Sequence, residues 1–153
     1  MQYLQELVQN KIIITAIVGW CCAQVLKTIT HLIVNKKLVW ERLIGDGGMP
    51  SAHSATVCGM AGATFFRCGP ASPEFGIALI FAIIVMHDAS GVRLETGKQA
   101  VLLNKMMESF VRLGDPTITA EERLKEFVGH TKLQVMMGAL LGILISVLMN
   151  WQG

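Results

Sequence analysis

Charged side chains are scarce in this sequence. Asp, Glu, Lys and Arg make up 16% of its 153 residues, the hydrophobic types make up 52%, and the mean hydropathy is +0.51. A typical soluble domain is about a quarter charged, so this composition argues against a soluble protein and favours a single membrane-embedded domain over residues 1–153. The net charge is only +2 and no basic run occurs, which indicates a lipid bilayer rather than nucleic acid as the partner.

Other familiar signals are missing too. The four cysteines show no C-x-x-C spacing and lie in or beside apolar runs, so we infer neither a zinc site nor a disulfide framework. The N-terminus lacks the basic segment and the cleavage site of a removable signal peptide, so the first apolar run is interpreted as a retained span. We expect no metal and no cofactor.

Four apolar segments are candidates to cross a bilayer, which needs roughly 20 apolar residues. They cover residues 11–34, 50–66, 75–86 and 133–149. Between the last two, residues 98–113 predict an amphipathic helix and residues 121–128 a short charged helix. The sequence therefore predicts an all-α polytopic bundle with about four transmembrane helices plus amphipathic and short cytoplasmic helices.

A polar stripe interrupts the first span. Gln24, Lys27 and His31 recur at i, i+3 and i+7, which places them on one face of a helix. A charge at membrane depth costs roughly 2.5 kcal/mol or more, so Lys27 is either a functional cation facing the bundle interior or a residue near the interface that snorkels outward. So small a bundle can hardly shield this stripe alone, which favours a homo-oligomer.

A glycine-rich turn precedes the second span, at residues 45–55 with the sequence GDGGMPSAHSA. The pattern predicts a turn that leads into a helix whose first turn contains Pro50. The first N–H groups of a helix and its positive dipole end favour an anion. Ser51 adds a hydroxyl, and His53 adds a proton that can move near neutral pH. The alternative is an ordinary loop with a capping serine and a polar histidine.

Topology brings a second histidine to the same place. With four spans, the connections at residues 35–49 and 92–132 lie on one side of the membrane and hold most of the lysines and arginines. The positive-inside rule makes that side cytoplasmic. His130, at the end of the second connection, is therefore expected on the same face as Ser51 and His53.

A carboxylate near the end of the third span needs a partner. Asp88 lies in the last turns of that predicted helix, where the negative dipole end disfavours it. Arg93 and Lys98 are the candidate cations.

Three ordered motifs now resemble one family. The motifs are GGMPSAHSA at residues 47–55, DASGVR at 88–93 with GKQA at 97–100 and LN at 103–104, and LKE at 124–126 with GHT at 129–131 and GALLG at 138–142. They are similar to the divergent type 2 phosphatidate phosphatase family, a bacterial and plant group of small membrane proteins related to acid phosphatases and vanadium-dependent haloperoxidases.

The resemblance implies a metal-independent phosphatase of membrane lipid phosphates or diphosphates. Ser51 and the nearby backbone N–H groups, including those of Gly48 and Ala52, would hold phosphate oxygens. His53 would protonate the leaving oxygen. His130 would attack phosphorus and form a phosphohistidine, which divides one hard displacement into two easier steps.

The chain departs from the pattern of the parent superfamily at three positions. Ala52 stands between the serine and the histidine where the parent has glycine, Gln134 stands where the parent has an aspartate four residues after the nucleophile, and no arginine lies six residues before His130. We hypothesise that Asp88 replaces the orienting carboxylate. For the phosphate-binding cations, the candidates are Lys27, Arg93 and Lys125.

Two other functions remain open. The same residues could serve a non-catalytic lipid-phosphate or anion binder, or a small transporter. A helical scaffold whose polar residues only satisfy one another is the third interpretation.

Overall fold

The regular structure consists of α-helices. The computed structural model describes residues 1–36, 48–112, 124 and 129–151, and within these ranges there are six helices and no strand. The helices are α1 (Gln2–Gln9), α2 (Lys11–Asn35), α3 (Ala52–Cys68), α4 (Pro73–Ser90), α5 (Val92–Arg112) and α6 (Lys132–Asn150). The predicted all-α membrane helical bundle is confirmed. The predicted helix at residues 121–128 lies outside the described residues.

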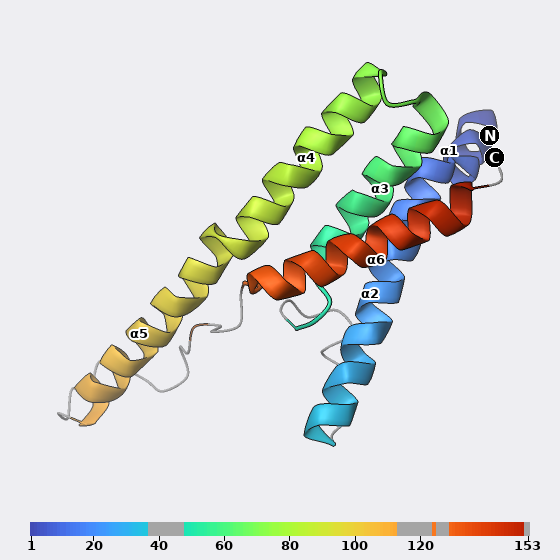
Figure 1. Ribbon diagram of the computed structural model, residues 1–153. Helices are drawn as coiled ribbons and strands as arrows, with labels where there is room; N and C mark the ends of the chain where they lie inside the picture. Colours follow the sequence, from blue (N-terminus) through green and yellow to red (C-terminus); the bar gives the residue numbers. More distant parts are fainter. Residues whose placement is uncertain (37–47, 113–123, 125–128, 152–153) are drawn as a thin grey trace.

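Helix α3 is the centre of the bundle. It packs against α2, α4 and α6 (Figure 1). Its neighbour α6 runs in the same direction, because Gly138 of α6 contacts Ser51 at the start of α3 while Ser146 contacts Gly62 farther along. Two parallel helices place both of their positive N-terminal ends at the same end of the bundle.

Polar side chains begin four of the helices. In each case the side-chain oxygen accepts a hydrogen bond from a backbone N–H in the first turn, which would otherwise lack a partner. The caps are Asn10 for α2, Ser51 for α3, Ser72 for α4 and Thr131 for α6. The prediction that Pro50 lies inside the first turn of a helix was wrong, since the capping serine follows it and α3 begins at Ala52.

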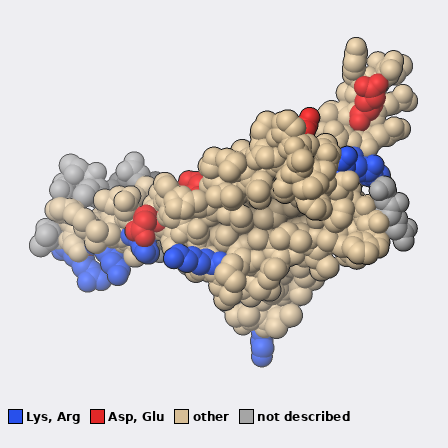
Figure 2. All heavy atoms as spheres, turned by 45° about the horizontal axis from the view of Figure 1, so that its top comes forward, with Lys and Arg blue, Asp and Glu red and all other residues tan. Residues whose placement is uncertain are grey.

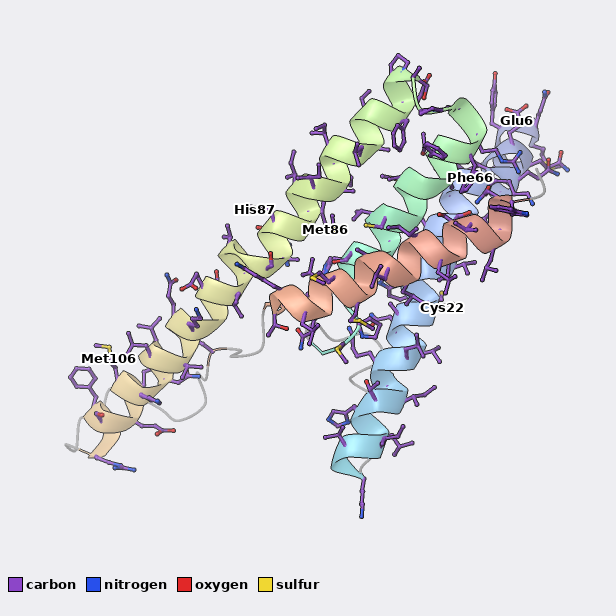
Figure 3. The ribbon with its side chains drawn as sticks, in the orientation of Figure 1. Glu6, Cys22, Phe66, Met86, His87 and Met106 are labelled. Atoms are coloured by element: carbon purple, nitrogen blue, oxygen red, sulfur yellow. The ribbon has the colours of Figure 1, made fainter. Side chains whose placement is uncertain are left out.

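Small residues make the helix contacts, and large apolar residues face outward. A methyl group on Gly138 would overlap the Ser51 carbonyl oxygen, and one on Gly142 would overlap that of Ala55. Meanwhile Ile77 and Leu148 are both 72% exposed. Large apolar side chains project outward along the long helices in Figure 3. In a soluble protein the large apolar side chains would be buried instead. Their outward position suits a protein surrounded by lipid, where small residues permit close helix packing.

Three stretches of the described chain are long and apolar enough to cross a membrane, by length and composition alone. They are Lys11–Val34, Pro73–Phe110 and Lys132–Asn150. The remaining predicted span corresponds to α3, which has 17 residues and lies among the other helices. In Figure 2 the charged side chains gather toward the ends of the visible face, and its broad middle carries few of them.

Helices α4 and α5 form one long rod with a break at Gly91 (Figure 1). The break is slight, since the Gly91 N–H donates to the His87 carbonyl and its own carbonyl accepts from Glu95. The prediction that the amphipathic helix starts at residue 98 was therefore wrong. It starts at Val92, because Gly91 keeps its hydrogen bonds to the turns on either side.

Candidate functional site

Two histidines from distant parts of the chain meet at one end of the bundle. His53 lies in the first turn of α3, and His130 lies directly before the Thr131 cap of α6. Their ring centroids are 5.7 Å apart at an interplanar angle of 65°. His130 is 1% exposed, whereas His53 is half-buried. The parallel course of α3 and α6 produces this pair, since it brings both helix starts together.

The two helix starts are joined by a backbone hydrogen bond. The Ser51 N–H donates to the Gln134 carbonyl oxygen over 3.0 Å. The Ser51 hydroxyl is fully buried and accepts from the Ser54 N–H over 3.4 Å. A hydroxyl can donate as well as accept, so the Ser51 hydroxyl hydrogen can point to an anion while its backbone N–H is already used.

Gln134 orients the ring of His130. Its side-chain oxygen accepts from the Thr131 N–H over 3.0 Å and lies 3.4 Å from Nδ1 of His130. With a hydrogen on Nδ1 donated to that oxygen, the lone pair of the ring lies on Nε2, the atom that a nucleophile needs. Gln134 thus belongs to a capping box and to the histidine environment at once.

Lys27 of α2 is buried beside the glycine turn. Its side chain is 3% exposed and passes so close to Gly48 that a Cβ there would lie 3.0 Å from Cγ of the lysine. Gly48 also has a φ of 87°, which favours glycine. Of the two predicted alternatives for Lys27, this burial matches the inward-facing one. An ammonium at such depth attracts an anion. We call Lys27, Ser51, His53, His130 and Gln134 the site cluster.

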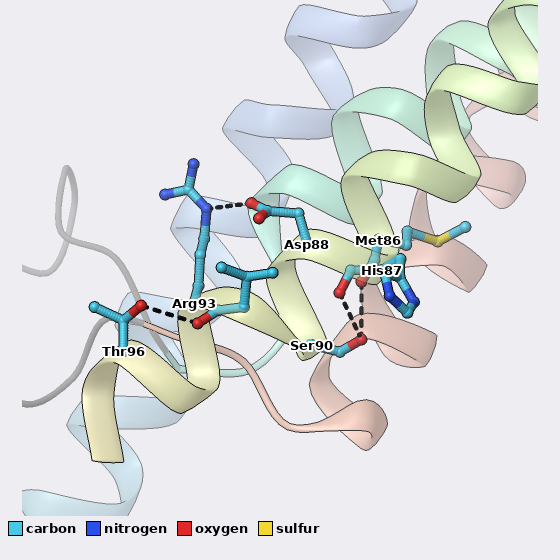
Figure 4. Close-up of polar contacts among 7 residues, drawn as sticks. Met86, His87, Asp88, Ser90, Arg93 and Thr96 are labelled. Atoms are coloured by element: carbon cyan, nitrogen blue, oxygen red, sulfur yellow. Dashed lines mark hydrogen bonds and ion pairs between the residues drawn. The ribbon is translucent and has the colours of Figure 1, made fainter. Parts of the chain in front are cut away.

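Asp88 pairs with Arg93, one of the two cations predicted for it. Asp88 accepts a hydrogen bond from Arg93 Nε over 2.7 Å in an ion pair, and both side chains are more than 40% exposed (Figure 4). Lys98, the other candidate cation, pairs with Glu95 instead. Asp88 thus neutralises Arg93 at the junction of α4 and α5, and the contact described for Nδ1 of His130 is with Gln134.

Two predicted site residues remain, Ala52 and Lys125. Ala52 is buried as the first residue of α3, beside Ser51. Lys125 lies outside the described residues. Within the described ranges, no group of three or more His, Cys, Asp or Glu side chains is arranged to hold a metal ion.

The rod of α4 and α5 holds His130 in place, which sequence reasoning missed. The His130 N–H donates to the Ala89 carbonyl over 3.0 Å. Gly129 lies so close to the backbone of Leu94 that a methyl group would not fit. The buried Asn104 side chain both donates to the Leu124 carbonyl and accepts from the Leu124 N–H, each over 3.0 Å. Leu124 and the pair Gly129 and His130 are therefore each attached to the rod.

A sequence signal for this attachment exists. Gly97, Ala100 and Asn104 are buried and recur at i, i+3 and i+7 on one face of α5. Small residues let the backbone of another segment approach the helix closely, and an amide side chain can both donate to and accept from a peptide group. Two small residues followed by an amide on an otherwise amphipathic helix therefore indicate a face against which another segment packs with its backbone.

The chain is similar to known proteins over nearly its whole length. The sequence pattern of a family described as the divergent PAP2 family matches residues 8–145. The chain is 36% identical over 154 residues to a Bacillus subtilis (strain 168) protein named uncharacterized membrane protein YuiD, which covers 95% of this chain and 98% of that one. No solved structure matches. The matched region includes every member of the site cluster, and on this evidence the chain is a membrane protein that belongs to the divergent PAP2 family.

Proposed function

We propose that this protein is a metal-independent phosphatase of membrane lipid phosphates or diphosphates. The observation that carries the proposal is the 5.7 Å separation of the His53 and His130 rings. A phosphoryl group beside the pair can contact one nitrogen of each ring, which is the geometry that a nucleophile and a proton donor require. Membership of a phosphatase-related family adds support.

The first step would transfer the phosphoryl group to the protein. Nε2 of His130 attacks phosphorus and forms a P–N bond while the P–O bond to the lipid breaks. His53 gives a proton to the departing oxygen, so that the lipid leaves as a neutral alcohol or a lipid monophosphate. Gln134 accepts the hydrogen on Nδ1 of His130 and so keeps Nε2 directed at phosphorus.

The second step would return the protein to its starting state. His53, now neutral, takes a proton from water as the water oxygen attacks phosphorus and the P–N bond breaks. The products are inorganic phosphate and free His130. Charge on the phosphoryl oxygens in both steps would be balanced by the buried ammonium of Lys27 and by the two helix N-termini.

The site cluster faces the cytoplasm in this proposal. The arginines and lysines of α5 occupy the same end of the bundle as the two helix starts. They are Arg93, Lys98, Lys105 and Arg112. Under the positive-inside rule, that end is cytoplasmic.

A second function is favoured by Gln134. Its amide can orient His130 by a hydrogen bond but cannot stabilise an imidazolium by charge, as an aspartate would. A site with this substitution could bind lipid phosphate through Lys27 and Ser51 without turning it over. Such a binder would be stabilised thermally by lipid phosphate while no inorganic phosphate appears.

Phosphate release from purified protein tests the proposal. Protein in detergent micelles with a metal chelator should release inorganic phosphate from a lipid monophosphate or diphosphate, and an acid-labile phosphoprotein should accumulate on rapid quenching. His130→Ala should lower the rate by about 10³-fold or more, because no other group replaces a nucleophile. His87→Ala is the matched control, since His87 is exposed on α4 (Figure 3).

The outcomes separate the two functions. Release that depends on His130 and not on His87 supports the phosphatase. Thermal stabilisation by lipid phosphate without release across a panel of headgroups supports the binder and rejects catalysis.

A further inference from the structure

An apolar groove runs beside the site cluster, between α2 and α6. Its volume is about 350 Å³, within the roughly 300–1,000 Å³ of ligand pockets. It is lined by Leu26, Thr30, Met49, Pro50, Met137, Leu140, Leu141 and Leu144. Thr30 contributes the only hydroxyl among these residues, and that hydroxyl is engaged with the carbonyl oxygens of Lys27 and Met49. The walls of the groove are therefore almost entirely apolar.

The groove is lined by sequence neighbours of the residues at the site. Met49 and Pro50 line it and directly precede Ser51. On the α2 side, Leu26 adjoins Lys27, whose side chain passes Gly48. On the α6 side, Met137 adjoins Gly138, which touches the Ser51 carbonyl. Each of the three walls thus contains a residue that is next in sequence to Lys27, Ser51 or Gly138.

The groove also opens toward lipid. Both helices that form it are long and apolar enough to cross a membrane. Leu140 and Leu144 on its wall are 58% and 54% exposed. A hydrocarbon chain could enter sideways from the bilayer without crossing a polar surface.

We propose that this groove, the tail groove, binds one hydrocarbon chain of the lipid whose phosphate occupies the site cluster. The inference rests on the proposed function and adds the part of the substrate that the histidines do not touch. The volume lies near the lower end of the ligand-pocket range, so it suits a single chain rather than two. Substrates are then selected by a phosphate and an adjoining apolar chain together.

A second groove provides the control. It has a volume of about 260 Å³ and lies along the first half of α2. It is lined by Ile12, Ile13, Ala16, Ile17, Trp20, Thr56 and Met60. Its walls are equally apolar, but they include no residue of the glycine turn. Lipid that merely surrounds the protein should fill both grooves alike.

The first experiment fills each groove with an indole. Leu144→Trp narrows the tail groove and Ile17→Trp narrows the control groove, and both positions are more than half exposed, so folding tolerates either change. For dodecyl phosphate, Leu144→Trp should raise KM by about tenfold or more, because pocket contacts of this size discriminate by that much. For butyl phosphate it should change nothing, and Ile17→Trp should change neither.

The second experiment measures binding without turnover. In a chain whose three native tryptophans are replaced by phenylalanine, a single tryptophan at position 144 or 17 reports on contact with a brominated chain. In nanodiscs, brominated single-chain phosphate should quench position 144 more than brominated phosphatidylcholine does. At position 17 the two lipids should quench equally.

The results separate this inference from the proposed function. Equal quenching by both lipids at both positions means ordinary lipid contact and overturns the tail groove, as does turnover of dodecyl phosphate that Leu144→Trp leaves unchanged. Selective quenching at position 144 without phosphate release from any substrate keeps the tail groove and rejects catalysis.

Discussion

Two buried polar groups of residues lie at opposite ends of the same helices, and they differ in charge. The site cluster contains Lys27 and two histidines. At the other end, Thr15, Ser146 and Asn150 form what we call the far cluster, where Asn150 Nδ2 donates to Thr15 Oγ1 over 3.3 Å and to the Ser146 carbonyl over 2.9 Å. All three are 3% exposed or less.

The donors of the far cluster are used in internal hydrogen bonds, whereas the side-chain oxygen of Asn150 is buried without a hydrogen-bond partner in the described part of the chain. The Ser146 hydroxyl donates to the Ile143 carbonyl and the Thr15 hydroxyl to the Lys11 carbonyl, both over 2.7 Å. None of its residues titrates near neutral pH, so the far cluster joins α2 to α6 and offers no side chain that moves a proton. Burial of polar atoms alone therefore does not mark a site in this bundle. A buried titratable group does, because it is costly in lipid and needs a reason to be kept.

After the loss of the nucleophile itself, the largest expected effect comes from removing the buried ammonium. Lys27→Met should lower phosphate release by about 10²- to 10³-fold, the cost of losing one preorganised charge-stabilising group. It should leave the thermal midpoint unchanged or raise it, because an apolar side chain of similar length often replaces a buried ion without loss of stability. Phosphate release and thermal unfolding in detergent measure the two effects.

Lys98→Met is the control for Lys27→Met, since Lys98 is exposed and pairs with Glu95. If Lys27→Met unfolds the protein while Lys98→Met does not, Lys27 belongs with the structural residues, and the contrast between the two clusters disappears.

The next effect concerns the contact that holds the helix starts together. Gly138→Ala should push α6 away from the Ser51 carbonyl and separate His130 from His53, which should lower release by about 10²-fold, the order of loss for a displacement near 1 Å. Gly142→Ala makes a similar overlap with the Ala55 carbonyl, one turn farther from the histidines. Each should reduce the free energy of unfolding by about 1–3 kcal/mol through overpacking.

Measuring the rate of phosphate release and the free energy of unfolding for Gly138→Ala and Gly142→Ala tests whether the histidine separation controls the rate. Equal loss of activity in the two would mean that general loosening, rather than the histidine separation, controls the rate.

The helices were largely predictable, because lipid imposes a simple rule on composition. The first and last spans were predicted at residues 11–34 and 133–149 and are observed as Lys11–Asn35 and Lys132–Asn150. Capping by Asn10 and Thr131 fixes where they start. Helix α1 and the early start of α5 escaped prediction, because a short amphipathic segment and a glycine-interrupted polar stretch resemble loops in sequence.

The site was predictable only in outline. The predicted topology expected His53 and His130 on one face, and the structure brings their rings together. The attachments of His130 were not foreseen, since Ala89, Leu94 and Leu124 contribute backbone atoms there. Any residue type can contribute backbone atoms, so these contacts are not visible at Ala89, Leu94 or Leu124 in the sequence. Only the residues on the other side of each contact, such as Gly129 and Asn104, indicate them.

A moderate effect is expected from detaching Leu124 from α5. Asn104→Leu removes both hydrogen bonds to Leu124, each worth about 1 kcal/mol. We expect Asn104 to act on the position of His130, which follows Leu124 by six residues, so kcat should fall by about tenfold while KM for lipid phosphate stays constant, as expected when a transition-state interaction is weakened. Hydrogen exchange at the Leu124 amide should accelerate in the same variant.

Lys105→Ala, one residue along α5 and exposed, is the control for Asn104→Leu. Faster exchange at Leu124 with an unchanged kcat would show that the attachment serves folding alone.

The smallest effect on activity is expected at the far cluster. Asn150→Leu removes the bond to Thr15, and interhelical hydrogen bonds in membranes contribute about 0.6 kcal/mol on average. The thermal midpoint should therefore fall only slightly, and release of phosphate should keep its normal rate, because no proton or charge is lost. A drop in activity without unfolding would mean that the far end communicates with the histidines along α6. In that case the site cluster and the far cluster would form one functional unit. The presence of titratable side chains would then no longer distinguish a catalytic cluster from a structural one in this bundle.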